Sequence, residues 1–119
     1  DHCVQNTPGD AFAASLERAR IRRVFQKGTD AGIDSYSGLF DNGHRKDTGL
    51  ADFLRDERVT DVYIAGLATD YCVKFTALDA AHLGYRTHVI RAGCRAVNLG
   101  PGDEAQAYAA LQSAGVLVE

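Results

Sequence analysis

The stretch Gly66-Leu67-Ala68-Thr69-Asp70-Tyr71-Cys72-Val73 directly follows the strand-forming run Asp61-Val62-Tyr63-Ile64-Ala65. The run is rich in β-branched and aromatic residues, which is typical of a buried strand. A helix is expected next, from about Asp70 to Leu83, with small residues along one face and Gly84 at its end. The segment therefore predicts a strand–turn–helix unit with Cys72 on the first turn of the helix.

The other predicted elements also alternate between strands and helices. Strands are expected at Arg22–Gln26, Arg86–Arg91 and Val116–Val118, and helices at Thr48–Asp56 and between Asp103 and Gly115. This alternation predicts an α/β fold built of βαβ units around a parallel sheet. Lys27, the Ala68–Cys72 turn and the Gly93-Cys94 turn each follow a strand end. We expect them along one rim of the sheet, where sites form in such folds.

Length and composition limit the class of protein. The 119 residues allow one domain at most. Thirteen Lys and Arg against sixteen Asp and Glu give a net charge of −3, which argues against a nucleic-acid partner. No apolar run approaches the ~18 residues of a membrane span, and no signal peptide is recognisable, so no membrane partner is expected. Three cysteines without secretory features fit reduced thiols in the cytoplasm.

Cys72 is the candidate nucleophile. Free backbone N–H groups and the positive end of a helix dipole favour the thiolate, which is the reactive form of cysteine. It would attack a carbonyl and form a thioester, with the backbone N–H groups of Ala68 and Cys72 holding the oxyanion. The alternative is a small buried hydrophobic residue, as most free cysteines are. Position alone leaves both interpretations open.

For three further residues, both a functional role and an ordinary structural or surface role are consistent with the sequence. Lys27 either stabilises negative charge on the sheet rim or is a solvated surface lysine. Tyr36 either lines a substrate pocket or fixes its loop. His2 is either a metal ligand or a loop histidine, because a metal site needs several converging ligands.

Simpler roles are expected for four other residues. Asp70 is predicted to accept N–H groups at its helix start rather than act as a base, and Cys94 to pack behind the rim. His82 and His88 are predicted to be exposed polar residues.

Together these residues resemble the nicotinamidases, within the isochorismatase-like cysteine hydrolase superfamily. The resemblance covers essentially the whole chain. It rests on His2-Cys3-Val4-Gln5, Lys27-Gly28-Thr29-Asp30, Asp34-Ser35-Tyr36-Ser37, Phe40-Asp41-Asn42-Gly43, Gly66–Thr76, Asp79-Ala80, Leu83-Gly84-Tyr85 and Gly93-Cys94-Arg95. It implies a three-layer parallel sheet with helices on both faces, incomplete at the amino end. Residues 1–119 would then be the carboxy-terminal portion of a single isochorismatase-like hydrolase domain.

The resemblance implies hydrolysis of nicotinamide, a small-molecule substrate, to nicotinate and ammonia in NAD salvage. The family uses an Asp-Lys-Cys triad, in which Cys72 matches the nucleophile and Lys27 the lysine. The bond between Leu67 and Ala68 matches a cis peptide, and the Ala68 N–H matches an oxyanion-hole donor. Tyr36 matches a pocket residue near the pyridine ring. His2 matches one ligand of a divalent metal ion, which is zinc, iron or manganese.

Part of the family pattern has no counterpart in this sequence. The triad aspartate and the remaining metal ligands lie in a segment that precedes the first matched motif, so His2 alone is not expected to retain metal. Because the chain starts at Asp1 rather than at an initiator Met, and starts inside a predicted loop, we interpret it as a fragment or as one piece of a nicked protein. Alone, it is expected to be inactive and prone to aggregate.

Two alternative functions stay open at this point. One is another amidohydrolase of the superfamily, acting on a carbamoyl or ureido substrate. A second is a catalytically incomplete, non-enzymatic fragment. As macromolecular partners, a second copy of the chain and a complementing amino-terminal segment both remain open.

Overall fold

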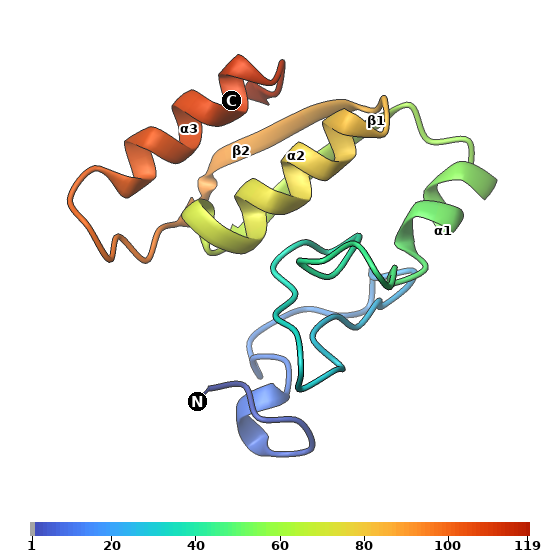
Figure 1. The fold of residues 1–119 in the computed structure, drawn as a ribbon. Helices are drawn as coiled ribbons and strands as arrows, with labels where there is room; N and C mark the ends of the chain where they lie inside the picture. Colours follow the sequence, from blue (N-terminus) through green and yellow to red (C-terminus); the bar gives the residue numbers. More distant parts are fainter. Residues whose placement is uncertain (1) are drawn as a thin grey trace.

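A three-stranded parallel sheet organises the second half of the chain (Figure 1). The computed structural model describes residues 2–119. The strands are β1 (Asp61–Leu67), β2 (Arg86–Arg95) and β3 (Leu117–Val118), and β2 lies between the other two. Helix α2 (Lys74–His82) connects β1 to β2, and α3 (Asp103–Ser113) connects β2 to β3. These connections form the predicted βαβ units.

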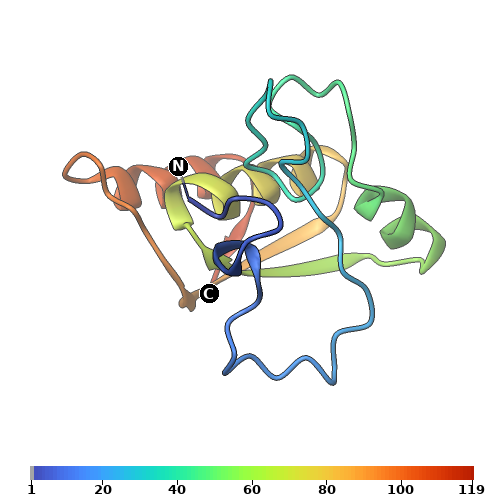
Figure 2. The same ribbon diagram turned by 90° about the horizontal axis from the view of Figure 1, so that it is seen from below.

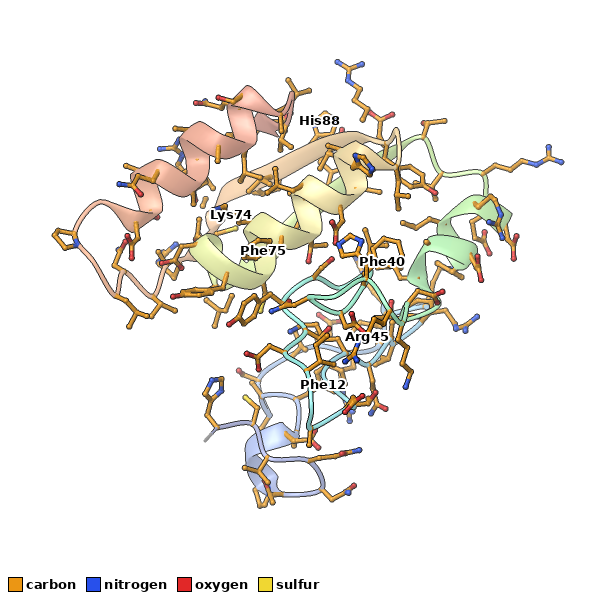
Figure 3. All side chains as sticks on the ribbon, viewed as in Figure 1. Phe12, Phe40, Arg45, Lys74, Phe75 and His88 are labelled. Atoms are coloured by element: carbon orange, nitrogen blue, oxygen red, sulfur yellow. The ribbon has the colours of Figure 1, made fainter. Side chains whose placement is uncertain are left out.

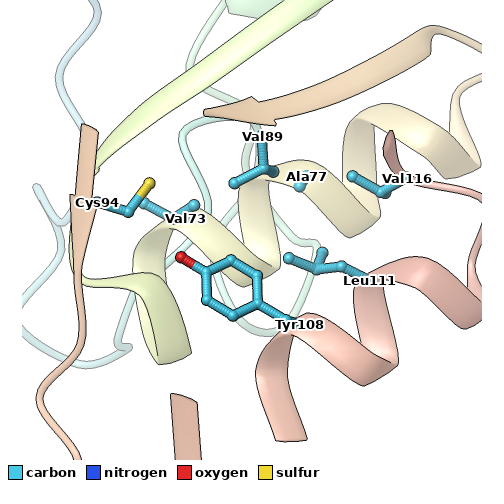
Figure 4. Close-up of a cluster of buried hydrophobic side chains, with 7 residues drawn as sticks. All are labelled: Val73, Ala77, Val89, Cys94, Tyr108, Leu111 and Val116. Carbon is cyan, nitrogen blue, oxygen red and sulfur yellow. The ribbon is translucent and has the colours of Figure 1, made fainter. Parts of the chain in front are cut away.

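Helices α2 and α3 lie side by side over one face of the sheet (Figure 2). Val89 of β2 points toward both helices and is fully buried between them (Figure 4). The whole cluster consists of Val73, Ala77, Val89, Cys94, Tyr108, Leu111 and Val116. Small residues such as Ala77 let α2 approach the sheet closely. Cys94 is buried in this core, as predicted.

The pairing of β1 with β2 is irregular near the carboxyl ends of the strands. Ile64 lies opposite Val89, whereas Gly66 lies opposite Cys94, so β2 contains extra residues in between. Gly93 belongs to this bulge, and a Cβ atom there would lie 3.0 Å from Cβ of Ala65. The close approach of the two strands therefore favours glycine at this position.

The first half of the chain contains little regular structure. It has one short 3₁₀ turn, Pro8–Asp10, before the helix α1 (Leu50–Asp56). The expected strand Arg22–Gln26 is wrong, because these residues find no partner strand among residues 2–119. Val24 at its centre is accordingly 55% exposed. The predicted loop from Thr29 to Asn42 is confirmed.

The turn after β1 differs from the prediction. A π-helical turn, Thr69–Val73, precedes α2, so Cys72 lies in a wide turn rather than in the first turn of an α-helix. Such turns occur often at functional sites. Strand β2 also continues to Arg95, four residues beyond its predicted end at Arg91.

His88 is buried, with 5% of its surface exposed, so the expectation of an exposed residue is wrong. Its Nδ1 lies 2.7 Å from Glu119 Oε1 and its Nε2 lies 3.2 Å from Asp61 Oδ2. The ring also stacks on Tyr63, with ring centres 4.2 Å apart. One histidine on β2 therefore joins β1 to the residue that follows β3. Figure 3 labels His88 on the sheet.

One face of β1 is open to solvent within the described residues. Tyr63 and Leu67 are 63% and 73% exposed and alternate along the strand, so they lie on the same face. No helix in residues 2–119 is both long and apolar enough to span a membrane.

Candidate active site

Lys27 and Cys72 lie together although they are 45 residues apart in the sequence. Lys27 Nζ is 3.4 Å from Cys72 Sγ and donates a hydrogen bond of 2.9 Å to the Ser35 carbonyl oxygen. The Ser35 carbonyl thus fixes the position of the ammonium group beside the half-buried sulfur. A cation at this distance stabilises negative charge on the sulfur.

The turn that carries Cys72 is closed by Ala68. The Ala68 carbonyl oxygen accepts hydrogen bonds of 3.1 Å from the N–H groups of Tyr71 and Val73, the two neighbours of Cys72. The Leu67–Ala68 peptide is cis in the structure. Ala68 therefore lies directly at the turn that carries Cys72, while its part in an oxyanion hole stays a prediction.

Tyr36 belongs to an aromatic group beside this turn. Its ring meets Tyr71 edge-on, with centres 5.4 Å apart, and stacks against Phe75 at 5.6 Å. Phe75 is labelled on α2 in Figure 3, next to Lys74, whose ammonium lies 5.4 Å from the Phe75 ring. Tyr36 is half-buried, so contact with its neighbours leaves part of the ring accessible. The contacts with Tyr71 and Phe75 hold the Tyr36 loop in place, while the role of Tyr36 in a substrate pocket stays a prediction.

The loop that carries Tyr36 is joined by hydrogen bonds to the helical segment that contains Cys72 and Thr76. The Gly38 N–H donates to Thr76 Oγ1 at 2.8 Å, and the Thr76 hydroxyl donates to the Cys72 carbonyl oxygen at 2.6 Å. Thr48 Oγ1 donates to the Gly38 carbonyl oxygen at 2.7 Å from the other side. Sequence reasoning missed Thr76, although its place four residues after Cys72 on one helix was a usable signal.

Asp70 was predicted to accept N–H groups at the start of its own helix, but its carboxylate bonds a different segment. Its two carboxylate oxygens accept hydrogen bonds of 2.9 Å from the N–H groups of Val97 and Asn98, beyond β2. Burial of Asp70 opposes its ionisation, but these N–H groups outweigh that effect and lower the pKa of the carboxyl group. Since both oxygens are occupied, Asp70 anchors the next loop and is no candidate for a general base.

A cavity of about 670 Å³ borders the site on the side of Lys27. Lys27 and Ser35 line it, and Cys72 does not. Its other walls come from residues 23 to 30, Ile33, Asp41 and residues 46 to 49. Lys27 is therefore the residue shared by the cavity and the Cys72 sulfur.

The donor set for a metal ion is incomplete in the described part of the chain. His2 is exposed, and its Nδ1 lies 3.4 Å from Cys3 Sγ. Among residues 2–119, no three His, Cys, Asp or Glu side chains converge as metal ligands. No hydrogen bond or aromatic contact joins His2 to the group around Cys72 in this range. These residues alone do not fit a bound metal ion.

The chain is similar in sequence and in fold to proteins of one family. Residues 1–118 match the model of the isochorismatase domain family. The chain is 50% identical over 115 residues to the nicotinamidase of Escherichia coli strain K12, covering 97% of this chain and 54% of that protein. It thus spans about half the length of the curated relatives it matches.

Two solved structures resemble the described fold. The first is PnC1 from L. infantum in complex with nicotinate, with a TM-score of 0.93, 34% identity and coverage of 99% of this chain and 58% of that one. The second is the pyrazinamidase of Pyrococcus horikoshii in complex with zinc, with a TM-score of 0.83, 35% identity and coverage of 100% and 61%. They confirm the predicted α/β fold, of which this chain holds part.

Proposed function

Because the chain belongs to the isochorismatase domain family, we propose that the protein hydrolyses nicotinamide to nicotinate and ammonia. The contact between Lys27 Nζ and Cys72 Sγ, 3.4 Å long, carries this proposal. It is supported by the name nicotinamidase given to the Escherichia coli relative and by the nicotinate bound to the L. infantum protein.

Cys72 is the nucleophile in the proposed reaction. The general acid–base, an aspartate outside these 119 residues, first takes the proton of the Cys72 thiol. The resulting thiolate, stabilised by Lys27, attacks the carboxamide carbon. The N–H groups of Ala68 and Cys72 hold the oxyanion of the tetrahedral intermediate, which collapses to a thioester as the C–N bond breaks. Ammonia leaves with a proton from the same aspartate. Water then attacks the thioester, releasing nicotinate and returning the proton to sulfur.

Tyr36 and His2 have supporting roles in this proposal. The accessible part of the Tyr36 ring forms a wall for the pyridine ring of the substrate. His2 contributes one imidazole to a divalent metal site whose other ligands lie outside these residues. Such an ion would offer a Lewis acid for the pyridine nitrogen. No step of the reaction above depends on it.

Residues 1–119 are, in this proposal, the carboxy-terminal part of one hydrolase domain acting in NAD salvage. A cytoplasmic location is supported by the three cysteines, which are free thiols at separate places in the described structure.

The decisive experiment compares two cysteine variants of the protein at its full natural length. Cys72→Ala should abolish ammonia release from nicotinamide, because it removes the attacking sulfur. Cys94→Ala is the matched control, since Cys94 is buried in the core and contacts the Ile90 carbonyl oxygen. Retained turnover in Cys72→Ala contradicts the proposal. A panel of carbamoyl and ureido substrates tests the alternative that the protein is another amidohydrolase of the superfamily. That alternative requires faster turnover of one of those compounds than of nicotinamide.

A further inference from the structure

Thr76 makes two hydrogen bonds through a single hydroxyl group. The oxygen donates its proton to the Cys72 carbonyl oxygen at 2.6 Å and accepts the Gly38 N–H at 2.8 Å. The first bond stays within the helical segment, and the second bridges 38 residues of sequence. The hydroxyl thus connects the nucleophile turn to the loop that carries Tyr36.

These contacts close a ring around the nucleophile. From Gly38 the chain runs back through Tyr36 to Ser35, whose carbonyl oxygen holds Lys27 Nζ. Lys27 Nζ in turn touches Cys72 Sγ, and the Cys72 carbonyl receives the Thr76 hydroxyl. Every link of the ring is a contact of 3.4 Å or less or a short piece of backbone.

We propose that Thr76 is a positioning residue that sets the place of Lys27 and Tyr36 relative to the Cys72 sulfur. Its hydroxyl bonds the Cys72 carbonyl oxygen rather than the sulfur, and it acts through the Gly38 N–H. The inference deepens the proposed function, since a displaced loop would move the ring-binding tyrosine and the charge-stabilising lysine together. Without the hydroxyl, the part-buried Gly38 N–H loses its acceptor and the loop is no longer held at that point.

The test compares Thr76→Ser with Thr76→Ala, which differ only in the hydroxyl oxygen. Cys72 is alkylated with iodoacetamide in the protein at its full natural length, and modified peptides are quantified by mass spectrometry. Exposed Cys3 serves as the internal reference. Thr76→Ala should lower the rate of Cys72 alkylation relative to Cys3 by about threefold to tenfold. Thr76→Ser should restore it. Thr87→Val is the matched control, because the Thr87 hydroxyl bonds only locally, to the Tyr85 carbonyl oxygen.

Steady-state kinetics with nicotinamide give the second measurement. Thr76→Ala should raise KM through Tyr36 and lower kcat through Lys27, and Thr76→Ser should reverse both changes. An unchanged or increased Cys72 alkylation ratio in Thr76→Ala overturns the proposal, as does failure of serine to restore the ratio. If Thr76→Ala does not fold, Thr76→Val provides the same comparison. Should the wild-type protein release no ammonia from nicotinamide, only the proposed function fails, and the alkylation ratio still decides the role of Thr76.

Discussion

Lys27 brings the only side-chain contact to the Cys72 sulfur among the hydrogen bonds of residues 2–119. Its ammonium is held by one backbone carbonyl, that of Ser35, and the rest of the side chain is exposed. A charge in this position acts on the sulfur and contributes little to packing. Loss of Lys27 should therefore change reactivity far more than stability.

Lys27→Met tests this separation. Turnover of nicotinamide should fall by about 10²-fold, because stabilisation of the developing charge is lost, while the melting temperature stays nearly unchanged. Lys46→Met is a suitable control, since Lys46 lines the same cavity but bonds Thr29 Oγ1 and not the sulfur. Equal losses in the two variants would show that general surface charge, rather than the contact with Cys72, matters.

At this scale the sequence predicted that Cys72 and Lys27 share one rim of the sheet, and the structure brings the two side chains together. The reason given for Lys27 was nevertheless wrong, because the strand Arg22–Gln26 that was expected to place it at the rim is not formed. The pairing of Asp70 with Val97 and Asn98 was not predictable, because it depends on how far β2 extends and where the next loop returns. Thr76 was partly predictable. Its spacing of four residues from Cys72 could be seen in the sequence, whereas its hydrogen bond with Gly38 could not.

At the scale of elements, His88 joins the three strands through two carboxylates. The hydrogen bond to Glu119 raises the pKa of His88, burial opposes this, and the bond to Asp61 raises it further. Conversely, the bond from His88 is the main cause of the lowered pKa of Asp61, with Thr60 adding to it. Arg86, 4.0 Å from Asp61, is the other charged group at this cluster.

The pH dependence of stability follows from the signs of these shifts. Because the pKa of folded His88 lies above its ordinary 6.5, its stabilisation is complete below 6.5 and is lost as the pH rises through the raised value. Asp61 behaves oppositely, losing its contribution as the pH falls below its ordinary 3.8 through the lowered value. Thermal melts should show His88→Gln destabilised below pH 6.5, with the difference from wild type shrinking in alkaline buffer.

The matched control for that series is His82→Gln, because His82 is exposed on α2. A pH-independent difference between His88→Gln and wild type would contradict the charged cluster. The burial of His88 escaped sequence reasoning, since strand alternation places a residue on a face but does not say what covers that face. The failed strand at Arg22–Gln26 has a related cause, because a strand depends on a partner that local sequence does not provide.

At the scale of the whole molecule, the described sheet has one covered and one open face. Helices α2 and α3 cover the first, whereas Tyr63 and Leu67 of the edge strand β1 face solvent on the other. An exposed apolar edge strand is a site for pairing with another chain. From β1 onward the order of strands and helices was predictable from alternation alone, whereas the expected strand Arg22–Gln26 was wrong.

The polypeptide of residues 1–119, prepared alone, should therefore self-associate as its concentration rises. Sedimentation velocity measures this directly, and Leu67→Lys should reduce the association by placing a charge on the open face. Leu99→Lys is the control, because Leu99 is equally exposed, at 78%, but lies in a loop. A monomer at every concentration would contradict the prediction.

The aromatic group at the site has a spectroscopic consequence. These 119 residues contain five tyrosines and no tryptophan, so tyrosine dominates their near-ultraviolet circular dichroism. Tyr36 and Tyr71 meet edge-on at 5.4 Å, an arrangement that couples the transitions of the two rings. A pyridine ring that binds against Tyr36 would disturb this pair before any bond is broken. The site thus contains its own optical reporter, which distinguishes ligand binding from turnover without an added label.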